Sequence, residues 1–165
     1  DGQPITEDWY KKDPDRYIRN LVELGEKVEF AELRILDLVY FKLVNDNFGH
    51  TTGDKVLKEF SQLLVEHIRD VDICGRWGGE EFLVICPETE LEAATTLAER
   101  LRKIIDSHQF TEVGNLTSSL GVAVYHQNDD IESLLKRVDD CLYQAKEEGR
   151  DLVVDENFIN STHRP

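Results

Sequence analysis

The sequence of 165 residues is long enough for one domain with a substantial apolar core and short for two. Hydrophobic residues make up 40% of it and charged residues 32%, a composition typical of a globular domain and not of a disordered chain. The net charge of −15 argues against binding to nucleic acid, and no stretch reaches the about 18 consecutive apolar residues of a membrane span.

The first half of the chain predicts an irregular lead-in, a helix, a strand, a second helix and a hairpin. Residues 1–15 are polar and contain two prolines, and an apolar stripe then predicts a helix over 16–28. The apolar run 33–39 is typical of a buried strand, and residues 53–68 have the spacing of an amphipathic helix. Two apolar runs around a glycine pair predict a β-hairpin over 73–86.

The second half alternates helix and strand. Amphipathic spacing predicts helices over 91–105 and 131–146, and Gly149 is placed to end the second of them. Residues 116–125 and 152–154 are expected to be strands. This order of elements predicts an α/β sandwich with a central sheet and helices on both faces.

The domain organisation that follows is one domain over 16–155 and a polar tail over 156–165, which we expect to be frayed. The chain does not begin with Met and contains none. We interpret it as a piece of a longer protein, so that any sensor or regulatory domain, or a membrane anchor, would lie outside these residues.

The three cysteines are Cys74, Cys86 and Cys141, an odd number without metal-binding spacing. Their apolar neighbours predict reduced, packed thiols, which fits the cytoplasm best. A catalytic thiol is the alternative, but no histidine lies in a suggestive local pattern.

The run Gly78-Gly79-Glu80-Glu81-Phe82 is the first candidate site. A plain hairpin turn accounts for the glycine pair. It does not account for two adjacent acids at the start of an apolar strand. Because neighbouring strand residues point to opposite faces, Glu80 and Glu81 cannot serve the same solvated face, and we expect one of them to reach a site.

The second candidate site follows the strand over 33–39. Asp37 lies near the end of this apolar run, where an acid is either a site residue or a cap for the next helix. Lys42 adds a cation, and Asn45 and Asp54 add amide and carboxylate edges. The patch therefore offers oxygens for a metal, a cation for phosphate, and polar edges for a purine.

Four ordered runs resemble one family, the GGDEF-type diguanylate cyclases. They are DLVYFKLVNDNFGHTTGD (37–54), GGEEF (78–82), SLGVAVY (119–125) and LYQAKEEGRD (142–151). The resemblance implies a nucleotide-cyclase-like palm fold, in which a mostly antiparallel sheet carries GGEEF on a hairpin. It also implies an enzyme that condenses two GTP molecules into cyclic di-GMP, with release of pyrophosphate, in a homodimer.

The resemblance implies a catalytic centre built on carboxylates. Two Mg²⁺ ions, or Mn²⁺ in their place, would be held by Asp37, Glu80 and the main-chain carbonyl of Leu38, since Mg²⁺ prefers oxygen ligands. Glu81 would help to deprotonate the attacking hydroxyl or orient metal and water. Lys42, Lys146 and Arg150 would neutralise the triphosphate, and Asn45 and Asp54 would read guanine. The implied substrate-binding residues are Phe41, Lys42, Asn45, Asp54, Gly78, Gly79, Lys146 and Arg150.

A second site is implied upstream of the hairpin. Arg69 and Asp72 match the family's RxxD product-inhibition motif, and Arg100 resembles a secondary arginine of that site. The alternative is a helix C-terminus, where a cation interacts favourably with the helix dipole.

Three departures from the family pattern keep other functions open. Val39 replaces a usual Asp, Asp151 replaces a usual Asn, and the usual LTGLxNR segment is not recognisable between Pro4 and Asn20. The rival function is a catalytically weak domain that binds cyclic di-GMP as a receptor. A structural dimerisation domain is a third possibility.

Overall fold

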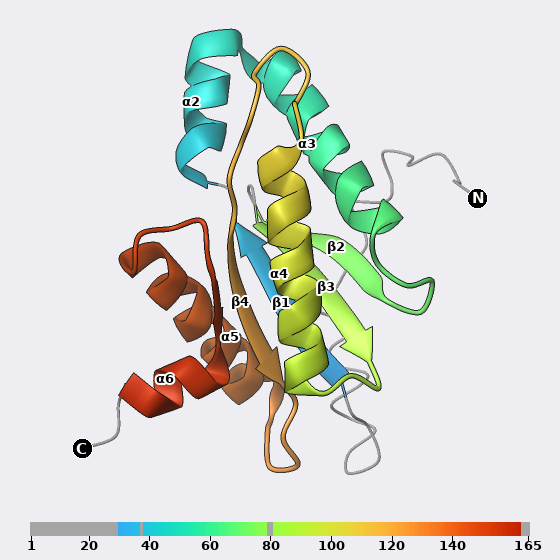
Figure 1. The fold of residues 1–165 in the computed structure, drawn as a ribbon, viewed down its shortest axis with the longest axis vertical. Helices are drawn as coiled ribbons and strands as arrows, with labels where there is room; N and C mark the ends of the chain where they lie inside the picture. The colour runs from blue at the N-terminus through green and yellow to red at the C-terminus, as the bar shows by residue number, and fades with distance from the viewer. Residues whose placement is uncertain (1–29, 37, 79–80, 163–165) are drawn as a thin grey trace.

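The computed structural model describes residues 30–36, 38–78 and 81–162 (Figure 1). The lead-in over 1–15 and the helix expected over 16–28 lie outside these residues. A five-stranded sheet forms the centre of the described part, with helices packed on both of its faces, as the order of elements predicted.

The sheet has the order β2-β3-β1-β4-β5 and is mostly antiparallel. β1 lies between β3 and β4 and is antiparallel to both, β2 and β3 form the predicted antiparallel hairpin, and β5 runs parallel to β4 at the edge. The strands are β1 (Phe30–Leu36), β2 (Ile73–Gly78), β3 (Glu81–Pro87), β4 (Ser119–Val124) and β5 (Val153–Asp155).

Side chains of β3 alternate between the two faces of the sheet and so join two different core clusters. Phe82 and Val84 pack in the cluster beneath α3 and α4, while Leu83 and Ile85 pack in the cluster beneath α5. α2 extends beyond the end of the sheet, where it packs on α3 (Figure 1). The helices are α2 (Leu38–Phe48), α3 (His50–Glu66), α4 (Leu91–Ser107), α5 (Ile131–Glu147) and α6 (Glu156–Thr162).

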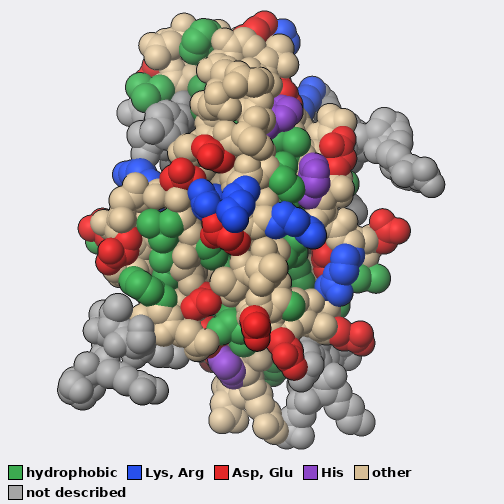
Figure 2. Space-filling view, viewed as in Figure 1, with side chains coloured by type: hydrophobic (Ala, Val, Ile, Leu, Met, Phe, Trp, Pro, Cys, Tyr) green, Lys and Arg blue, Asp and Glu red, His purple; other side chains and the backbone are tan. Residues whose placement is uncertain are grey.

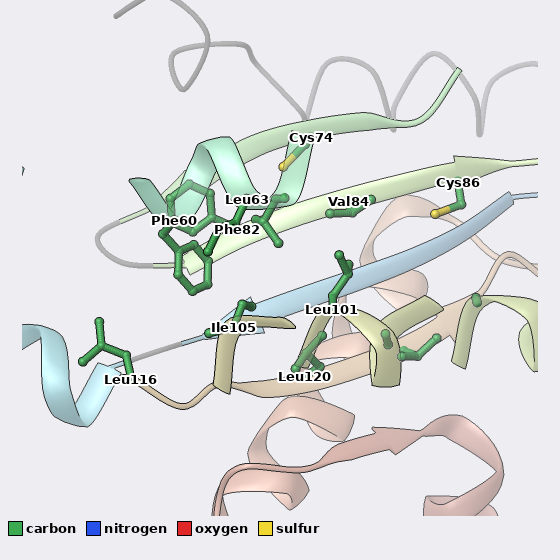
Figure 3. Packing of buried hydrophobic residues seen from close by; sticks show 14 of the residues in the cluster. Phe60, Leu63, Cys74, Phe82, Val84, Cys86, Leu101, Ile105, Leu116 and Leu120 are labelled. Carbon is green, nitrogen blue, oxygen red and sulfur yellow. The ribbon is translucent and has the colours of Figure 1, made fainter. Parts of the chain in front are cut away.

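The larger cluster is built around aromatic rings. The rings of Phe60 on α3 and Phe82 on β3 lie 5.1 Å apart between centroids, and Leu101 and Ile105 of α4 point at the same face of the sheet (Figure 3). Such ring pairs add about 0.5–1.5 kcal/mol to the stability gained from burial alone. This packing fixes α3 and α4 against the hairpin strand that begins at Glu81.

On the other face, Gly121 lets α5 approach β4 very closely. A Cβ atom at this position would lie 2.6 Å from the backbone nitrogen of Leu142 and 2.7 Å from the carbonyl oxygen of Val138. The SLGVAVY run therefore needs glycine at its third position, Gly121, because the backbone of α5 occupies the space of a side chain. The same approach fixes where the C-terminal end of α5 lies relative to the sheet.

The structure corrects three boundaries predicted from the sequence. The strand expected over 33–39 begins at Phe30 and ends at Leu36, so Val39 lies in α2, a helix that the sequence analysis missed. α3 begins at His50, before the glycine where we expected it. The tail expected to be frayed instead forms α6, and the side chain of Glu156 at its start is buried.

The sequence predicted no membrane span, and among the described helices none is both long and apolar enough to cross a membrane.

Candidate functional site

The register of the sheet brings the flanks of both predicted catalytic patches to one end of the molecule. Leu36, the last residue of β1, lies opposite Glu81 on β3 and opposite Ser119 on β4. Gly78 at the end of β2 pairs with Glu81. Asp37, Gly79 and Glu80 lie outside the described residues, but the residues on either side of them are therefore neighbours in the sheet.

Glu81 starts β3 and is half-buried. Because Phe82 packs toward α3 and α4, its neighbour Glu81 points to the opposite face, which α5 covers. This is the face on which the C-terminal turn of α5, with Lys146, lies against β4 and β5.

α2 begins at Leu38, directly beyond β1, so the main chain of Leu38, Phe41 and Lys42 lies in the first turns of a helix at this end of the sheet. Asn45 follows in the last turns of α2 and is half-buried, and its carbonyl accepts a hydrogen bond from the N–H of Gly49 at 2.9 Å.

The turn between α2 and α3 depends on Gly49, whose φ of 86° lies in the left-handed region. Asp54 follows in the first turns of α3 and is exposed. The two residues expected to read guanine, Asn45 and Asp54, therefore lie on the two helices that this glycine joins.

Lys146 and Arg150 flank the end of α5, which closes with a Schellman motif. The N–H of Gly149 donates to the carbonyl of Lys146 at 3.3 Å, and the N–H of Arg150 donates to the carbonyl of Ala145 at 3.0 Å. Gly149 has a φ of 118°, which confirms its predicted role in ending the helix.

The chain after the Schellman motif returns to the start of β4. The N–H of Asp151 donates to Ser119 Oγ at 3.3 Å, and the N–H of Leu120 donates to the carbonyl of Leu152 at 3.0 Å. Because Ser119 is the partner of Leu36, the cations at the end of α5 lie at the same end of the sheet as Leu36 and Glu81.

Sequence reasoning missed Ser119 and Arg102 as parts of this end of the molecule. Ser119 is buried and holds the turn after α5, while Arg102 reaches across from α4 to Asp151 with Nη1 and Oδ1 2.9 Å apart. A small polar residue at the start of a strand could have indicated the role of Ser119. No local pattern indicates the contact of Arg102 with Asp151, because 49 residues separate these partners.

The residues of the predicted product-inhibition site line a pocket of about 530 Å³ between the end of α3 and the first half of α4. Its polar residues come from the Arg69–Asp72 turn, from Glu88, Thr89 and Glu90, and from Arg100, and its apolar floor comes from α4. In Figure 2, Lys and Arg side chains gather over the middle of the face that α4 forms, with acidic side chains beside them.

The guanidinium of Arg69 is held in place by its own motif partner. Nη2 donates to Asp72 Oδ1 at 2.7 Å, to Thr89 Oγ1 at 2.8 Å and to the carbonyl of Pro87 at 3.0 Å. The Asp72 side chain has 0% exposure, whereas that of Arg69 is 52% exposed. Hydrogen bonding to Asp72 raises the pKa of Arg69.

This geometry argues against the alternative of a cation at the helix C-terminus, and the role in product inhibition stays a prediction. α3 ends at Glu66, so Arg69 lies in the following turn and does not cap the helix dipole. Asp72 orients the arginine from below, and the arginine presents its exposed edge to the pocket. Arg100 lies across the pocket, where Nη2 donates to the carbonyl of His67 at 2.8 Å.

The three cysteines are free and buried, as predicted. Burial raises the pKa of Cys86 and of Cys141 to about 12, so both stay protonated at neutral pH and are poor nucleophiles. This counts against a catalytic thiol at either position, although Cys86 lies at the base of the Arg69 pocket.

Among the residues that the structure describes, no group of three or more His, Cys, Asp or Glu side chains is arranged to hold a metal ion. The two predicted carboxylate ligands, Asp37 and Glu80, lie outside those residues. The backbone on either side of them converges at the end of β1, which is compatible with a shared oxygen-ligand site.

Comparison with known proteins identifies relatives across most of the chain. The family model described as diguanylate cyclase, GGDEF domain matches residues 16–152. The response regulator PleD of Caulobacter vibrioides is 45% identical over 126 residues, which cover 73% of this chain and 28% of PleD. The diguanylate cyclase DgcM of Escherichia coli is 41% identical over 144 residues, which cover 84% of this chain and 35% of DgcM. The chain thus spans roughly a third of the length of these relatives.

Solved structures share the fold. The active GGEEF domain of a diguanylate cyclase from Vibrio cholerae superposes with a TM-score of 0.73 at 35% identity, covering 86% of this chain and 90% of that one. The GGDEF domain of DgcB from Caulobacter crescentus, solved in complex with c-di-GMP, gives a TM-score of 0.80 at 26% identity, covering 87% of this chain and 88% of that one.

Proposed function

Because the chain belongs to the GGDEF domain family of diguanylate cyclases, we propose that it joins two molecules of GTP into cyclic di-GMP and releases two pyrophosphates. The observation that carries the proposal is the register of the sheet. It brings the end of β1 together with Gly78 and Glu81, which lie on either side of the hairpin turn, and the turn after α5 is bonded to Ser119 at the same end of the sheet. The catalytic domain then spans 16–155, after the lead-in over 1–15.

Diguanylate cyclases of this family need a divalent metal. In this chain the ligands are Asp37, Glu80 and the main-chain carbonyl of Leu38, a set of hard oxygen donors that suits Mg²⁺ and also Mn²⁺. Two such ions, held by these residues, would polarise the α-phosphate and stabilise the departing pyrophosphate.

The reaction balances as two equivalent displacements. The 3′-hydroxyl oxygen of each GTP forms a bond to the α-phosphorus of the other, the α–β anhydride bond breaks, and pyrophosphate leaves with the bonding electrons. Glu81, on the face of the sheet that α5 covers, takes the hydroxyl proton directly or through water.

Binding of the nucleotide is divided between two sides of the site. Lys42, Lys146 and Arg150 neutralise the triphosphate, and Gly78 and Gly79 let the backbone approach it. Phe41 is a further substrate-binding residue. Asn45 and Asp54 pair with the guanine edge, and adenine lacks the matching donors. A buried polar edge left unpaired costs about 1–3 kcal/mol, which gives the selectivity.

One domain holds one GTP, so turnover requires two domains face to face and therefore a homodimer. The longer relatives favour a sensor or regulatory domain elsewhere in the protein, with this domain in the cytoplasm, where GTP is available.

Product feedback is the regulatory part of the proposal. The pocket with Arg69 and Arg100 presents two cations to a dianionic ligand, and Asp72 keeps the Arg69 guanidinium in place. The same prearranged pocket favours one other function, a receptor that binds cyclic di-GMP without making it.

The deciding experiment is to incubate the purified domain with GTP and Mg²⁺ and to separate the products by chromatography. We expect cyclic di-GMP and pyrophosphate, and we expect Glu80→Ala to abolish both while circular dichroism shows an intact fold. Binding of cyclic di-GMP without any turnover by the wild type would establish the receptor instead. Undiminished turnover by Glu80→Ala would refute the assignment of that ligand.

A further inference from the structure

Arg102, a mostly buried arginine on α4, ties this helix to the turn that carries Arg150. Its Nη1 donates to Asp151 Oδ1 at 2.9 Å, and its Nε donates to Glu99 Oε1 at 2.9 Å. Only 17% of the Arg102 side chain is exposed, compared with 38% for Asp151. Most surface ion pairs join two exposed side chains, whereas this one has a fixed and largely dehydrated cation.

The turn that Arg102 contacts has an unfavourable backbone conformation. Gly149, Arg150 and Asp151 have φ angles of 118°, 65° and 51°, so two residues with a Cβ lie in the left-handed region. Such a conformation persists only where surrounding contacts hold it. Here the contacts are the N–H of Arg150 to Ala145, the N–H of Asp151 to Ser119, and the carboxylate of Asp151 to Arg102.

Asp151 also introduces a charge problem. Its carboxylate follows directly after Arg150, the residue proposed to bind the triphosphate. A carboxylate without a counter-ion would repel an anionic ligand there and would compete for the Arg150 guanidinium. In the described part of the chain, Arg102 is the cation that pairs with Asp151.

We propose that Arg102 is a positioning residue for the triphosphate site. Arg102, whose guanidinium also pairs with Glu99, offsets part of the charge of Asp151 and holds the left-handed turn, so that Arg150 faces the substrate instead of its own neighbour. The inference rests on the proposed role of Arg150 in binding GTP. It gives α4 an indirect part in the substrate site, through the contact of Arg102 with Asp151.

Arg102 could instead only stabilise the fold. Replacing Asp151 with a neutral residue separates this structural role from the proposed positioning role. Asp151→Asn removes the charge but keeps an oxygen that accepts a hydrogen bond. If the charge matters, Arg102→Ala is harmful in the wild-type background and nearly harmless when combined with Asp151→Asn. If Arg102 only stabilises the fold, the second substitution restores nothing.

The test measures KM and kcat for GTP with Mg²⁺, and the binding of the α,β-methylene analogue of GTP by calorimetry. The analogue cannot release pyrophosphate, so its binding reports on the site without turnover. The variants are Arg102→Ala, Arg102→Gln, Asp151→Asn and the double variant Arg102→Ala with Asp151→Asn. Lys136→Ala is the matched control, because it removes an exposed pair with Asp140 on α5.

We expect Arg102→Ala and Arg102→Gln to raise KM and weaken analogue binding by about three- to tenfold, equivalent to about 0.7–1.4 kcal/mol, with kcat within about twofold of wild type. Asp151→Asn and Lys136→Ala should stay within about twofold, and the double variant should recover most of the loss. The proposal is overturned if both Arg102 variants bind the analogue like wild type, or if the double variant is no better than Arg102→Ala. A wild type that binds the analogue but makes no product would refute the proposed enzyme and leave the Arg102 comparison measurable.

Discussion

Gly121→Ala tests the packing that places the end of α5 at the active end of the sheet. The added Cβ would lie 2.6 Å from the backbone nitrogen of Leu142 and 2.7 Å from the carbonyl oxygen of Val138. Ordinary contacts of this kind are about 3.5 Å, so the helix or the strand has to retreat by close to 1 Å. Because both nearest atoms belong to a helical backbone, no rotamer change can relieve the clash.

The expected cost follows from this geometry. Overpacking of a well-packed core costs about 1–3 kcal/mol. For a domain of this size each kcal/mol lowers the melting temperature by roughly 2–4 °C, so we expect a drop of about 2–12 °C. Since α5 carries Lys146, a shift of this helix in Gly121→Ala should also raise KM for GTP.

The assay is urea unfolding followed by circular dichroism, with thermal unfolding as a second measurement. Cys141→Ala is the control, because the Cys141 Cβ lies 3.1 Å from the added atom and remains after truncation. The truncation should therefore fail to rescue Gly121→Ala. A Gly121→Ala variant within about 0.5 kcal/mol of wild type would show that α5 does not lie against β4 in this way.

Three further predictions concern feedback, base selection and pH. Arg69→Ala should abolish product inhibition and weaken the binding of cyclic di-GMP measured by calorimetry, because it removes a coupling free energy of about 1–3 kcal/mol between the product pocket and the reaction. Inhibition equal to that of wild type would refute the assignment of the pocket. ATP should be a very poor substrate in the same chromatographic assay, and Asp54→Ala should narrow the preference for GTP; equal rates with ATP and GTP in the wild type would contradict the guanine contacts. Asp129→Asn should lower the free energy of unfolding by about 1–3 kcal/mol at pH 7, measured by urea titration. Burial raises the pKa of Asp129, but hydrogen bonds from Arg137, the His126 N–H and Ser133 lower it more, so the net shift is downward. The ionised carboxylate stabilises the folded state at pH values above its unfolded pKa, which is near 4, and this contribution is lost as the pH falls through the lower pKa of the folded state. The free energies of unfolding of wild type and Asp129→Asn should therefore converge below about pH 4. A constant difference between them down to about pH 2 would refute the ion pair.

The elements that sequence reasoning found are those with a local signal. The hairpin boundaries were predictable because a glycine pair separates two apolar runs, and the end of α5 was predictable because Gly149 follows an amphipathic stretch. The end of β1 was not, since the apolar run continues to Val39. β1 ends at Leu36 because its pairing with both neighbours ends there. Its partners at this position, Glu81 and Ser119, are the first residues of β3 and β4.

The features that were missed depend on partners far away in the sequence. Glu156 begins α6 because its buried carboxylate accepts the N–H of Val124 at 2.8 Å and contacts His126 Nε2 at 2.6 Å. A polar stretch gives no sign of such partners, which is why a frayed tail was expected. The site was predicted as a set of residues, but the sequence held no information on Asp72 orienting Arg69 or on Arg102 pairing with Asp151.

The separation between the Arg69 pocket and the proposed catalytic end of the sheet constrains how feedback can work on the proposed function. β3 begins at Glu81 on the catalytic end and ends at Pro87, whose carbonyl accepts a hydrogen bond from Arg69. Six residue steps along an antiparallel strand span about 20 Å, so a product bound at Arg69 lies too far away to displace GTP within the same domain. The proposed inhibition would therefore act on the other proposed requirement of the reaction, the approach of two GTP-loaded domains. A ligand that joins Arg69 and Arg100 to another domain can hold the pair apart while both nucleotide sites stay intact.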